Sequence, residues 1–334
     1  MNEEIEALLQ SHVAPIISKL ESMEKRLNEV RSLVLQLARG TGADFVVLGG
    51  LAGSRGHRPA AREQTFKPGE EADARPMRLL KLGGSVLTHK DRYRALRSRA
   101  VARLAREIAV SGSRDLAVVH GAGSFGHVLA RRYGLAGGYR RPEQLLGLAR
   151  VQRDVRSLNL AVLEALTRAR VPAIAIPPSI VARFEGGRLA SFDGDPFDHF
   201  LRLGFTPISF GDAVLDAQRG FAICSGDDVM LELARRFRPD RVVFAVDVDG
   251  VFTADPKRVR SATLVARVSP ATVPSIDLSP NAVADVTGSL EAKILKMAEI
   301  ARFAGDVRIV NGLKPGRVAR ALRGRAVPGT KVVP

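Results

Sequence analysis

The first 39 residues carry apolar side chains at intervals of three and four, which is the period of one face of an α-helix. Glu, Lys and Arg fill most of the other positions, so 1–39 is predicted to form an amphipathic helix with a break or kink at Pro15. The apolar face fits either a short coiled coil or a helix docked on the rest of the chain. Residues 40–76 are rich in Gly, Arg, Pro and Glu, and 52–76 is predicted to be a linker. In this prediction, residues 1–76 form an N-terminal extension.

From residue 77 onward, short apolar runs of strand length alternate with longer segments of helical period. The predicted strands cover 78–82, 116–119, 171–176, 206–210, 241–246 and 307–310. The predicted helices cover 93–110, 143–168, a segment that opens at Ser225 with Asp228 as its capping partner, 287–303 and 315–322. Two hairpins are expected, one with a Gly-Gly turn at 186–187 and one turning near 218–220. The alternation predicts an α/β fold over 77–334, a three-layer α/β/α sandwich around a mainly parallel central sheet.

Composition places the chain among ordinary globular proteins, with 46% hydrophobic residues and 26% charged residues. A single cysteine, Cys224, excludes an intramolecular disulfide, and we expect it to be a small buried side chain. No apolar run reaches the length of a membrane span, and the N-terminus lacks the pattern of a signal peptide. These features favour a cytoplasmic protein without a membrane partner.

The formal net charge of +16 is unevenly distributed. Residues 1–76 contain 10 Lys and Arg against 11 Asp and Glu, which leaves 41 against 24, or +17, for 77–334. Such a domain attracts phosphorylated ligands. Nucleic acid is not expected as a partner, because the three tyrosines are scattered and no basic run contains interleaved aromatic residues.

Two glycine-rich turns directly follow predicted strands. One turn covers 120–127, from His120 to His127, and the other contains Gly83, Gly84 and Ser85 after Lys81. A strand, a glycine turn and a helix in this order direct backbone N–H groups and the positive end of a helix dipole toward an anion. The spacing differs from that of the P-loop and of the dinucleotide fingerprint. The alternative for 120–127 is a tight turn with a packed structural histidine.

The predicted parallel sheet places four polar segments at one edge, because the carboxyl ends of parallel strands lie together. They are 81–85, 121–127, 247–251 and 288–293. Two glycine turns and several lysines supply the positioning and positive charge that phosphoryl transfer requires. Lys293 has a simpler alternative as a solvated lysine of an amphipathic helix. The remaining histidines have no metal-ligand spacing, so no metal-binding residue is predicted.

Residues 77–334 resemble the amino acid kinase superfamily, and within it the isopentenyl phosphate kinases of archaea. The segments that match are 81–87 with Lys90, 120–127, 223–228, 245–251 and 285–288 with Lys293. The histidine-terminated glycine turn and the Ser-Gly-Asp-Asp segment point to the isopentenyl phosphate branch. The sequence departs from many relatives at Ala122 and Ser289, where glycine is usual. Both residues are small, so we expect them to be tolerated, although Ala122 restricts φ in the turn and is expected to tighten the substrate pocket.

The resemblance implies ATP-dependent phosphorylation of isopentenyl phosphate to isopentenyl diphosphate in isoprenoid biosynthesis. The implied ATP site comprises Lys81, Gly83, Gly84, Ser85, Gly123, Asp247, Gly288 and Lys293. The implied catalytic residues are Lys81, Lys90, Lys293 and Asp227, which orders the lysines. The implied acceptor site comprises Ala122, Gly123, His127 and Gly211. ATP with Mg²⁺, a small-molecule phosphate substrate and a homodimer are also implied.

Two alternatives stay open at this point. One is a kinase of another small phosphate or of a carboxylate in the same superfamily. The other is a nucleotide-binding regulatory or storage protein that kept the fold without turnover.

Overall fold

The computed structural model describes residues 77–89, 92–256, 258–276 and 290–334, together with 14–15, 18–19, 21–26, 28–29 and 32 of the N-terminal extension. The chain divides into two compact units, Met1–Thr65 and Phe66–Pro334, and the division falls inside the segment predicted as a linker. The described residues of the first unit are helical and exposed, including Ala14 and Pro15. The residues on either side of Ala14 and Pro15 lie outside the described residues, so the break or kink expected near Ala14 stays a prediction.

Eight strands of the described chain form the main sheet of the second unit, in the order β10–β12–β11–β9–β1–β2–β6–β3. Every neighbouring pair is parallel except β11 and β12. The strands are β1 (Arg78–Leu82), β2 (Leu116–His120), β3 (Ala173–Ala175), β6 (Thr206–Phe210), β9 (Arg241–Val246), β10 (Arg267–Val268), β11 (Asp306–Asn311) and β12 (Gly329–Val332). The predicted mainly parallel sheet is confirmed.

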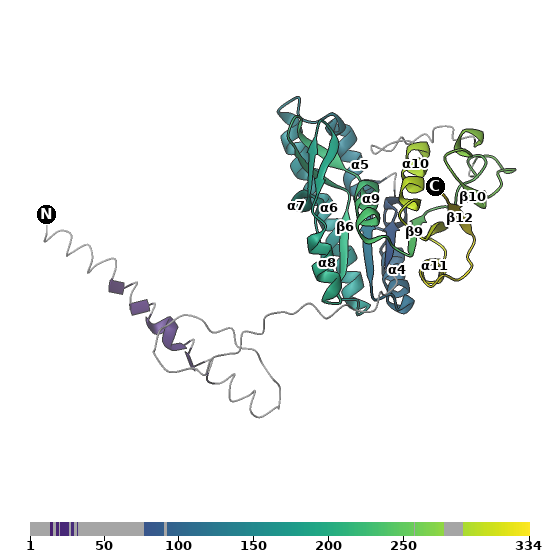
Figure 1. Cartoon of the computed structure of the whole chain (residues 1–334). Coiled ribbons are helices and arrows are strands. Elements are labelled where there is room, and N and C mark those ends of the chain that lie inside the picture. Colours follow the sequence, from purple (N-terminus) through teal and green to yellow (C-terminus); the bar gives the residue numbers. More distant parts are fainter. Residues whose placement is uncertain are drawn as a thin grey trace. The chain divides into compact units, whose positions relative to one another are not determined.

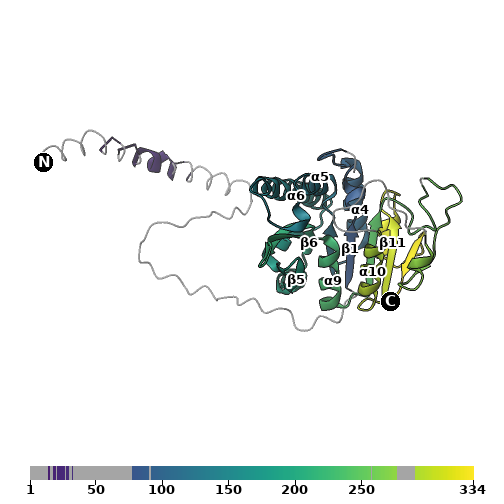
Figure 2. The same cartoon turned by 90° about the horizontal axis from the view of Figure 1, so that it is seen from above.

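Helices cover both faces of this sheet, as the view from above shows (Figure 2). One face carries α4 (Ser98–Ser111), α5 (Gly123–Arg132), α6 (Glu143–Arg168) and α11 (Arg317–Leu322). The other carries α8 (Asp195–Arg202), α9 (Gly226–Phe237) and α10 (Leu290–Ala301). Side chains alternate along β1, because Leu79 packs in the core with α9 and α10 while Leu80 and Leu82 pack in the core with α4 and α6. The three-layer α/β/α sandwich is thereby confirmed.

A smaller four-stranded sheet, β5–β4–β7–β8, stands at the upper left of the second unit in Figure 1. It consists of the two predicted hairpins, β4 (Ala182–Glu185) with β5 (Arg188–Phe192) and β7 (Asp212–Asp216) with β8 (Gly220–Cys224). Both glycines of the first turn have positive φ, +60° at Gly186 and +85° at Gly187. Only Gly211 separates the end of β6 from the start of β7, so the small sheet begins at the carboxyl edge of the main sheet.

Some elements differ from the sequence prediction. The helix expected from residue 93 begins at Ser98, because Arg94 has a φ of +52° and Leu96 forms an isolated bridge with Thr88. The sequence pattern did not predict α8, β10 or β12. Strands β10 and β12 have two and four residues, which is too short for an alternation to be recognised, and α8 has only eight residues, with Phe197 and Leu201 buried.

Candidate active site

The carboxyl ends of four neighbouring strands lie at one level. The register pairs Leu82 of β1 with His120 of β2 and with Ala245 of β9, and it pairs His120 with Phe210 of β6. The first turn residue after each of these ends therefore lies beside its neighbours, as predicted for a parallel sheet.

Glycines continue the sheet ladder beyond the ends of the strands. The Gly83 N–H donates to the Ala245 carbonyl at 2.8 Å, and the Gly121 N–H donates to the Leu82 carbonyl at 2.9 Å. The Gly211 N–H donates in the same way to the His120 carbonyl at 3.1 Å. These bonds fix three turns side by side, so the site is built on backbone rather than on flexible side chains.

The two glycine turns touch each other directly. A Cβ atom on Gly84 would lie 2.5 Å from the amide nitrogen of Gly123, and one on Gly121 would lie 2.7 Å from the amide nitrogen of Gly84. Gly123 also has a φ of +49°, and a Cβ atom there would lie 2.3 Å from Thr88 Oγ1. Glycine is required at these positions because the backbones of the two turns pack directly on each other. The same packing brings the N-termini of α3 (Gly84–Leu87) and α5 together.

Ala122 is the N-cap residue of α5 and adopts φ −69° and ψ −23°, a conformation that alanine reaches without strain. Replacing the usual glycine with Ala122 therefore causes no backbone strain in the turn. A Cβ atom on Gly126 would lie 2.5 Å from the Ala122 methyl group, so the methyl packs against α5 itself. His127 lies in the same helix and is partly buried.

Lys81 forms an ion pair with Asp227 of α9. Lys81 Nζ lies 2.5 Å from Asp227 Oδ1, and the side chains are only 13% and 6% exposed. The contact lies outside hydrogen-bond geometry, and among the described residues Asp227 Oδ1 has no hydrogen-bond donor. The Lys81 ammonium also lies 6.0 Å from the centre of the Phe244 ring. The predicted pairing of Asp227 with a lysine of the site is present for Lys81.

Comparison with known proteins decides the family. The amino acid kinase family model matches residues 76–311, most of the chain. The chain belongs to the amino acid kinase family. Isopentenyl phosphate kinase of Methanothermobacter thermautotrophicus is 36% identical over 264 residues, 77% of this chain and 98% of that protein. Isopentenyl phosphate kinase of Thermoplasma acidophilum is 36% identical over 244 residues, 72% of this chain and 94% of that protein. A solved structure of an isopentenyl phosphate kinase has a TM-score of 0.67 at 33% identity, covering 77% of this chain and 100% of the other.

In this amino acid kinase, α9 is linked to α10, the helix that contains Lys293. Ser225 and Asp228 form a capping box at the start of α9, as predicted. Asp228 also pairs with Lys296, one turn beyond Lys293. Asp228 therefore does more than cap the helix as predicted, because it also joins α10 to the helix of Asp227. The reading of Lys293 as a catalytic lysine stays a prediction.

The third polar segment, 247–251, joins the first, 81–85, through one hydrogen bond. Ser85 Oγ donates to Asp247 Oδ1 at 2.9 Å, which connects the turn after β1 with the turn after β9. Asp249 accepts from Asn311 Nδ2 at 2.8 Å and lies 2.8 Å from Arg317 Nη1. Burial alone would raise the pKa of Asp249, but the hydrogen bond from Asn311 and the adjacent charged guanidinium of Arg317 lower it below its ordinary value.

Gly211 lies between the glycine turn and α9. A Cβ atom there would lie 3.5 Å from the Cys224 carbonyl oxygen and from the Gly226 amide, and 3.9 Å from the Ala122 amide nitrogen. The next residue, Asp212, is buried and accepts two hydrogen bonds from the Arg156 guanidinium at 3.0 and 3.2 Å. No role for Arg156 could be predicted from the sequence, because nothing in its own segment indicates a partner 56 residues later.

The sequence prediction is only partly tested by this geometry. The structure brings together Lys81, the first glycine turn, the Gly121–Gly123 turn, Gly211, Asp227 and Asp247. Lys90 and Gly288 lie outside the described residues, as does Ser289. Cys224 is buried and free, as expected, and burial raises its pKa well above the ordinary value.

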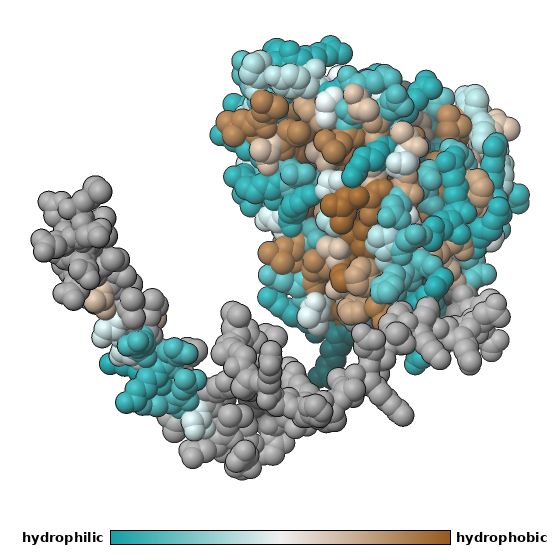
Figure 3. Space-filling model, turned by 60° about the vertical axis from the view of Figure 1, so that its left-hand side comes forward, coloured by the Kyte–Doolittle hydropathy of each residue, from teal (hydrophilic) through white to brown (hydrophobic). Residues whose placement is uncertain are grey.

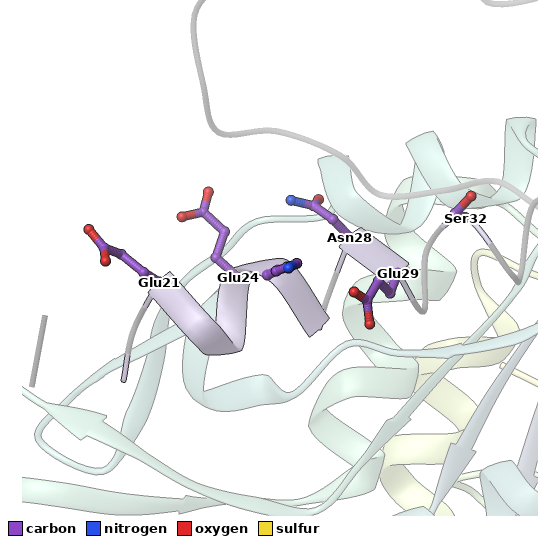
Figure 4. A pocket seen from close by; sticks show the side chains of 6 residues that line it. Glu21, Glu24, Asn28, Glu29 and Ser32 are labelled. Atoms are coloured by element: carbon purple, nitrogen blue, oxygen red, sulfur yellow. The ribbon is translucent and has the colours of Figure 1, made fainter. Parts of the chain in front are cut away.

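A shallow hollow in the N-terminal extension differs from this site in the charge of its side chains. It is lined by Glu21, Glu24, Lys25, Asn28, Glu29 and Ser32 (Figure 4). Three carboxylates would repel a phosphate, and none of these residues belongs to the predicted site. Within the described ranges, no group of three or more His, Cys, Asp or Glu could hold a metal ion, and no helix has the length and apolarity to cross a membrane.

Proposed function

We propose that this chain transfers the γ-phosphoryl group of ATP to isopentenyl phosphate, forming isopentenyl diphosphate and ADP for isoprenoid biosynthesis. The observation that carries the proposal is the contact between the two glycine turns, Gly84 on Gly121 and Gly123, beside the buried Lys81–Asp227 pair. Two phosphate-binding turns in backbone contact suit a reaction that joins two phosphates. The identity of the acceptor is inferred from the relatives named isopentenyl phosphate kinase.

In this proposal the donor lies on the turn after β1. The amides of Gly84 and Ser85 face the ATP phosphates, Gly83 fixes this turn on β9 through its bond to the Ala245 carbonyl, and Lys81 neutralises part of the phosphate charge. Asp227 fixes the Lys81 side chain through the ion pair, so that the ammonium is in place before ATP arrives. Asp247, held by Ser85, lies near the nucleotide. Gly123 and Gly288 complete the predicted ATP site.

The acceptor lies on the turn after β2. The amides of Ala122 and Gly123 and the His127 side chain hold the phosphate that isopentenyl phosphate already carries, with Gly211 against the substrate. An oxygen of that phosphate attacks the γ-phosphorus, and the bond from the γ-phosphorus to the β,γ-bridging oxygen breaks as ADP leaves. Phosphate oxygen is already an anionic nucleophile, so no strong general base is required.

Positive charge compensates the charge that develops during transfer. Lys90 and Lys293 are the residues proposed to stabilise the transferring group. ATP enters with Mg²⁺ bound to its phosphates, which supplies further positive charge. Among the described residues, no group of three or more His, Cys, Asp or Glu could hold the ion, so it would be held by phosphate oxygens and water.

The protein is proposed to act as a homodimer in the cytoplasm. The face of the second unit shown in Figure 3 carries apolar patches between hydrophilic ones. Large apolar side chains exposed on this unit include Ile180 at 65%, Leu215 at 61% and Leu203 at 42%. Covering such side chains would favour self-association. Sedimentation velocity of the full chain should give a dimer mass, and a monomer at micromolar concentration would contradict this part of the proposal.

An assay of ADP release with a panel of acceptors tests the function. Isopentenyl phosphate should exceed other small phosphates, carboxylates and amino acids in kcat/KM by at least about a hundredfold. A better acceptor of another class would establish a different kinase of the same fold. ATP binding without turnover on any acceptor would establish a regulatory or storage protein.

A further inference from the structure

His120, the last residue of β2, is fully buried at the base of the acceptor turn. Its ring stacks on Phe210 of β6, with centroids 5.2 Å apart and planes inclined by 20°. The proposed transfer assigns this imidazole no part, although it begins the glycine turn that ends at His127. Two contacts of the ring nitrogens indicate what it does.

One nitrogen of the ring faces a donor. His120 Nε2 lies 3.2 Å from Asn159 Nδ2 of α6, and Asn159 is itself 5% exposed. An amide NH₂ group can only donate, so Nε2 accepts and the ring proton resides on Nδ1. This is the tautomer assigned by the hydrogen-bond network.

The other nitrogen faces an acceptor. His120 Nδ1 lies 3.2 Å from the carbonyl oxygen of Gly121, to which the Nδ1–H donates. Burial lowers the pKa of His120 to about 4, against the opposing effect of the Gly121 hydrogen bond, so the ring is neutral at pH 7. Both contacts are consistent with one neutral tautomer.

The Gly121 carbonyl shares a peptide plane with the Ala122 N–H, and the described chain contains no cis peptide bond. In a trans peptide the two groups point in opposite directions, so holding the oxygen fixes the direction of the N–H. The Ala122 nitrogen lies 3.9 Å from the position of a Cβ atom on Gly211, which places it beside the proposed acceptor site.

We propose that His120 is a positioning residue: held by Asn159 as the Nδ1–H tautomer, it fixes the Gly121–Ala122 peptide so that the Ala122 N–H points at the acceptor phosphate. The identity of the acceptor rests on the proposed function. The competing role for His120 is packing on Phe210 alone.

The tautomer is measured without any reaction. The full-length protein, labelled with ¹⁵N in its histidine rings, should show His120 with a protonated Nδ1 and an unprotonated Nε2 throughout pH 6–8. A protonated Nε2, fast exchange between tautomers, or an imidazolium at pH 7 would overturn the proposal. If the wild type proves inactive on isopentenyl phosphate, the proposed function fails and this spectrum still decides the state of His120.

Two substitutions separate positioning from packing. Asparagine places its amide NH₂ where Nδ1–H stands, so His120→Asn should keep the acceptor KM within about threefold of wild type. His120→Phe keeps a ring against Phe210 but loses the donor, so the acceptor KM should rise about tenfold or more while the KM for ATP stays within about twofold. The matched control is Ser209→Ala on the neighbouring strand, where the buried hydroxyl has no hydrogen-bond partner among the described residues. It should change neither KM.

The reverse order would overturn the proposal. If His120→Phe is tolerated and His120→Asn is not, the ring acts by packing. Equal changes in the KM of both substrates would also exclude a role confined to the acceptor turn. Should either variant fail to fold, the ¹⁵N spectrum of the wild type remains the deciding measurement.

Discussion

The buried ion pair between Lys81 and Asp227 gives a quantitative prediction for stability. The two side chains are 13% and 6% exposed, and their charged atoms are 2.5 Å apart. Removing one partner leaves the other charge buried without compensation, which costs about 3–5 kcal/mol. Lys81→Met and Asp227→Asn should each lower the free energy of unfolding by about this amount. For a domain of this size the melting temperature should then fall by roughly 6–20 °C.

The double variant isolates the interaction. Lys81→Met with Asp227→Asn removes both charges, so its loss should be smaller than the sum of the single losses by about 2 kcal/mol or more. Urea unfolding of the four proteins, followed by circular dichroism, measures this coupling. The exposed pair Arg168–Glu164, at 81% and 52% exposure, serves as the control and should couple by less than about 0.5 kcal/mol. Single losses that add without coupling would refute the buried pair.

Four further predictions concern Gly211, Lys293, His120 and the N-terminal extension. Gly211→Ala should fold normally, because its Cβ meets only ordinary contacts, but its methyl group beside Ala122 should raise the acceptor KM at least about tenfold and leave that of ATP unchanged. Lys293→Ala should lower kcat by about 10²–10³; near-normal kcat would support the solvated-lysine alternative. Because the folded pKa of His120 is lowered to about 4 from 6.5, protons bind the unfolded state first as pH falls. Between pH 6.5 and pH 4, the free energy of unfolding of the wild type should therefore fall more steeply than that of His120→Asn, by about 1.4 kcal/mol per pH unit. Denaturant titrations at several pH values measure this difference. A protein starting at Met77 should fold and keep kcat and both KM values; an inactive or insoluble product would mean that the extension packs into the kinase domain.

Much of the main sheet could be predicted from the sequence. The strands at 78–82, 206–210 and 241–246 are short apolar runs bounded by Gly, Pro or charged residues, and the structure places them at those bounds. The helix at 143–168 has an uninterrupted period and also agrees at both ends. Parallel pairing then puts the turns after these strands at one edge, so the position of the site followed from the pattern.

Contacts between distant segments could not be predicted in this way. Asp228 appears in the sequence as a helix cap, and its second partner, Lys296, is 68 residues away. The tautomer of the buried His120 ring depends on Asn159, 39 residues later on α6. The requirement for glycine at 84 comes from the packing of the other turn, which no local spacing records. Local period and turn chemistry determine the elements, but pairing across the sheet determines the chemistry of the side chains.

The measurement that tests the central claim most directly is steady-state ADP release by the full-length protein with ATP, Mg²⁺ and isopentenyl phosphate, together with ³¹P NMR of the product. The account predicts ATP-dependent appearance of the two coupled resonances of a second diphosphate ester beside those of ADP, and loss of turnover in Lys81→Met. Formation of ADP without this second diphosphate ester, with phosphoryl transfer to a carboxylate or to another phosphate instead, would contradict it.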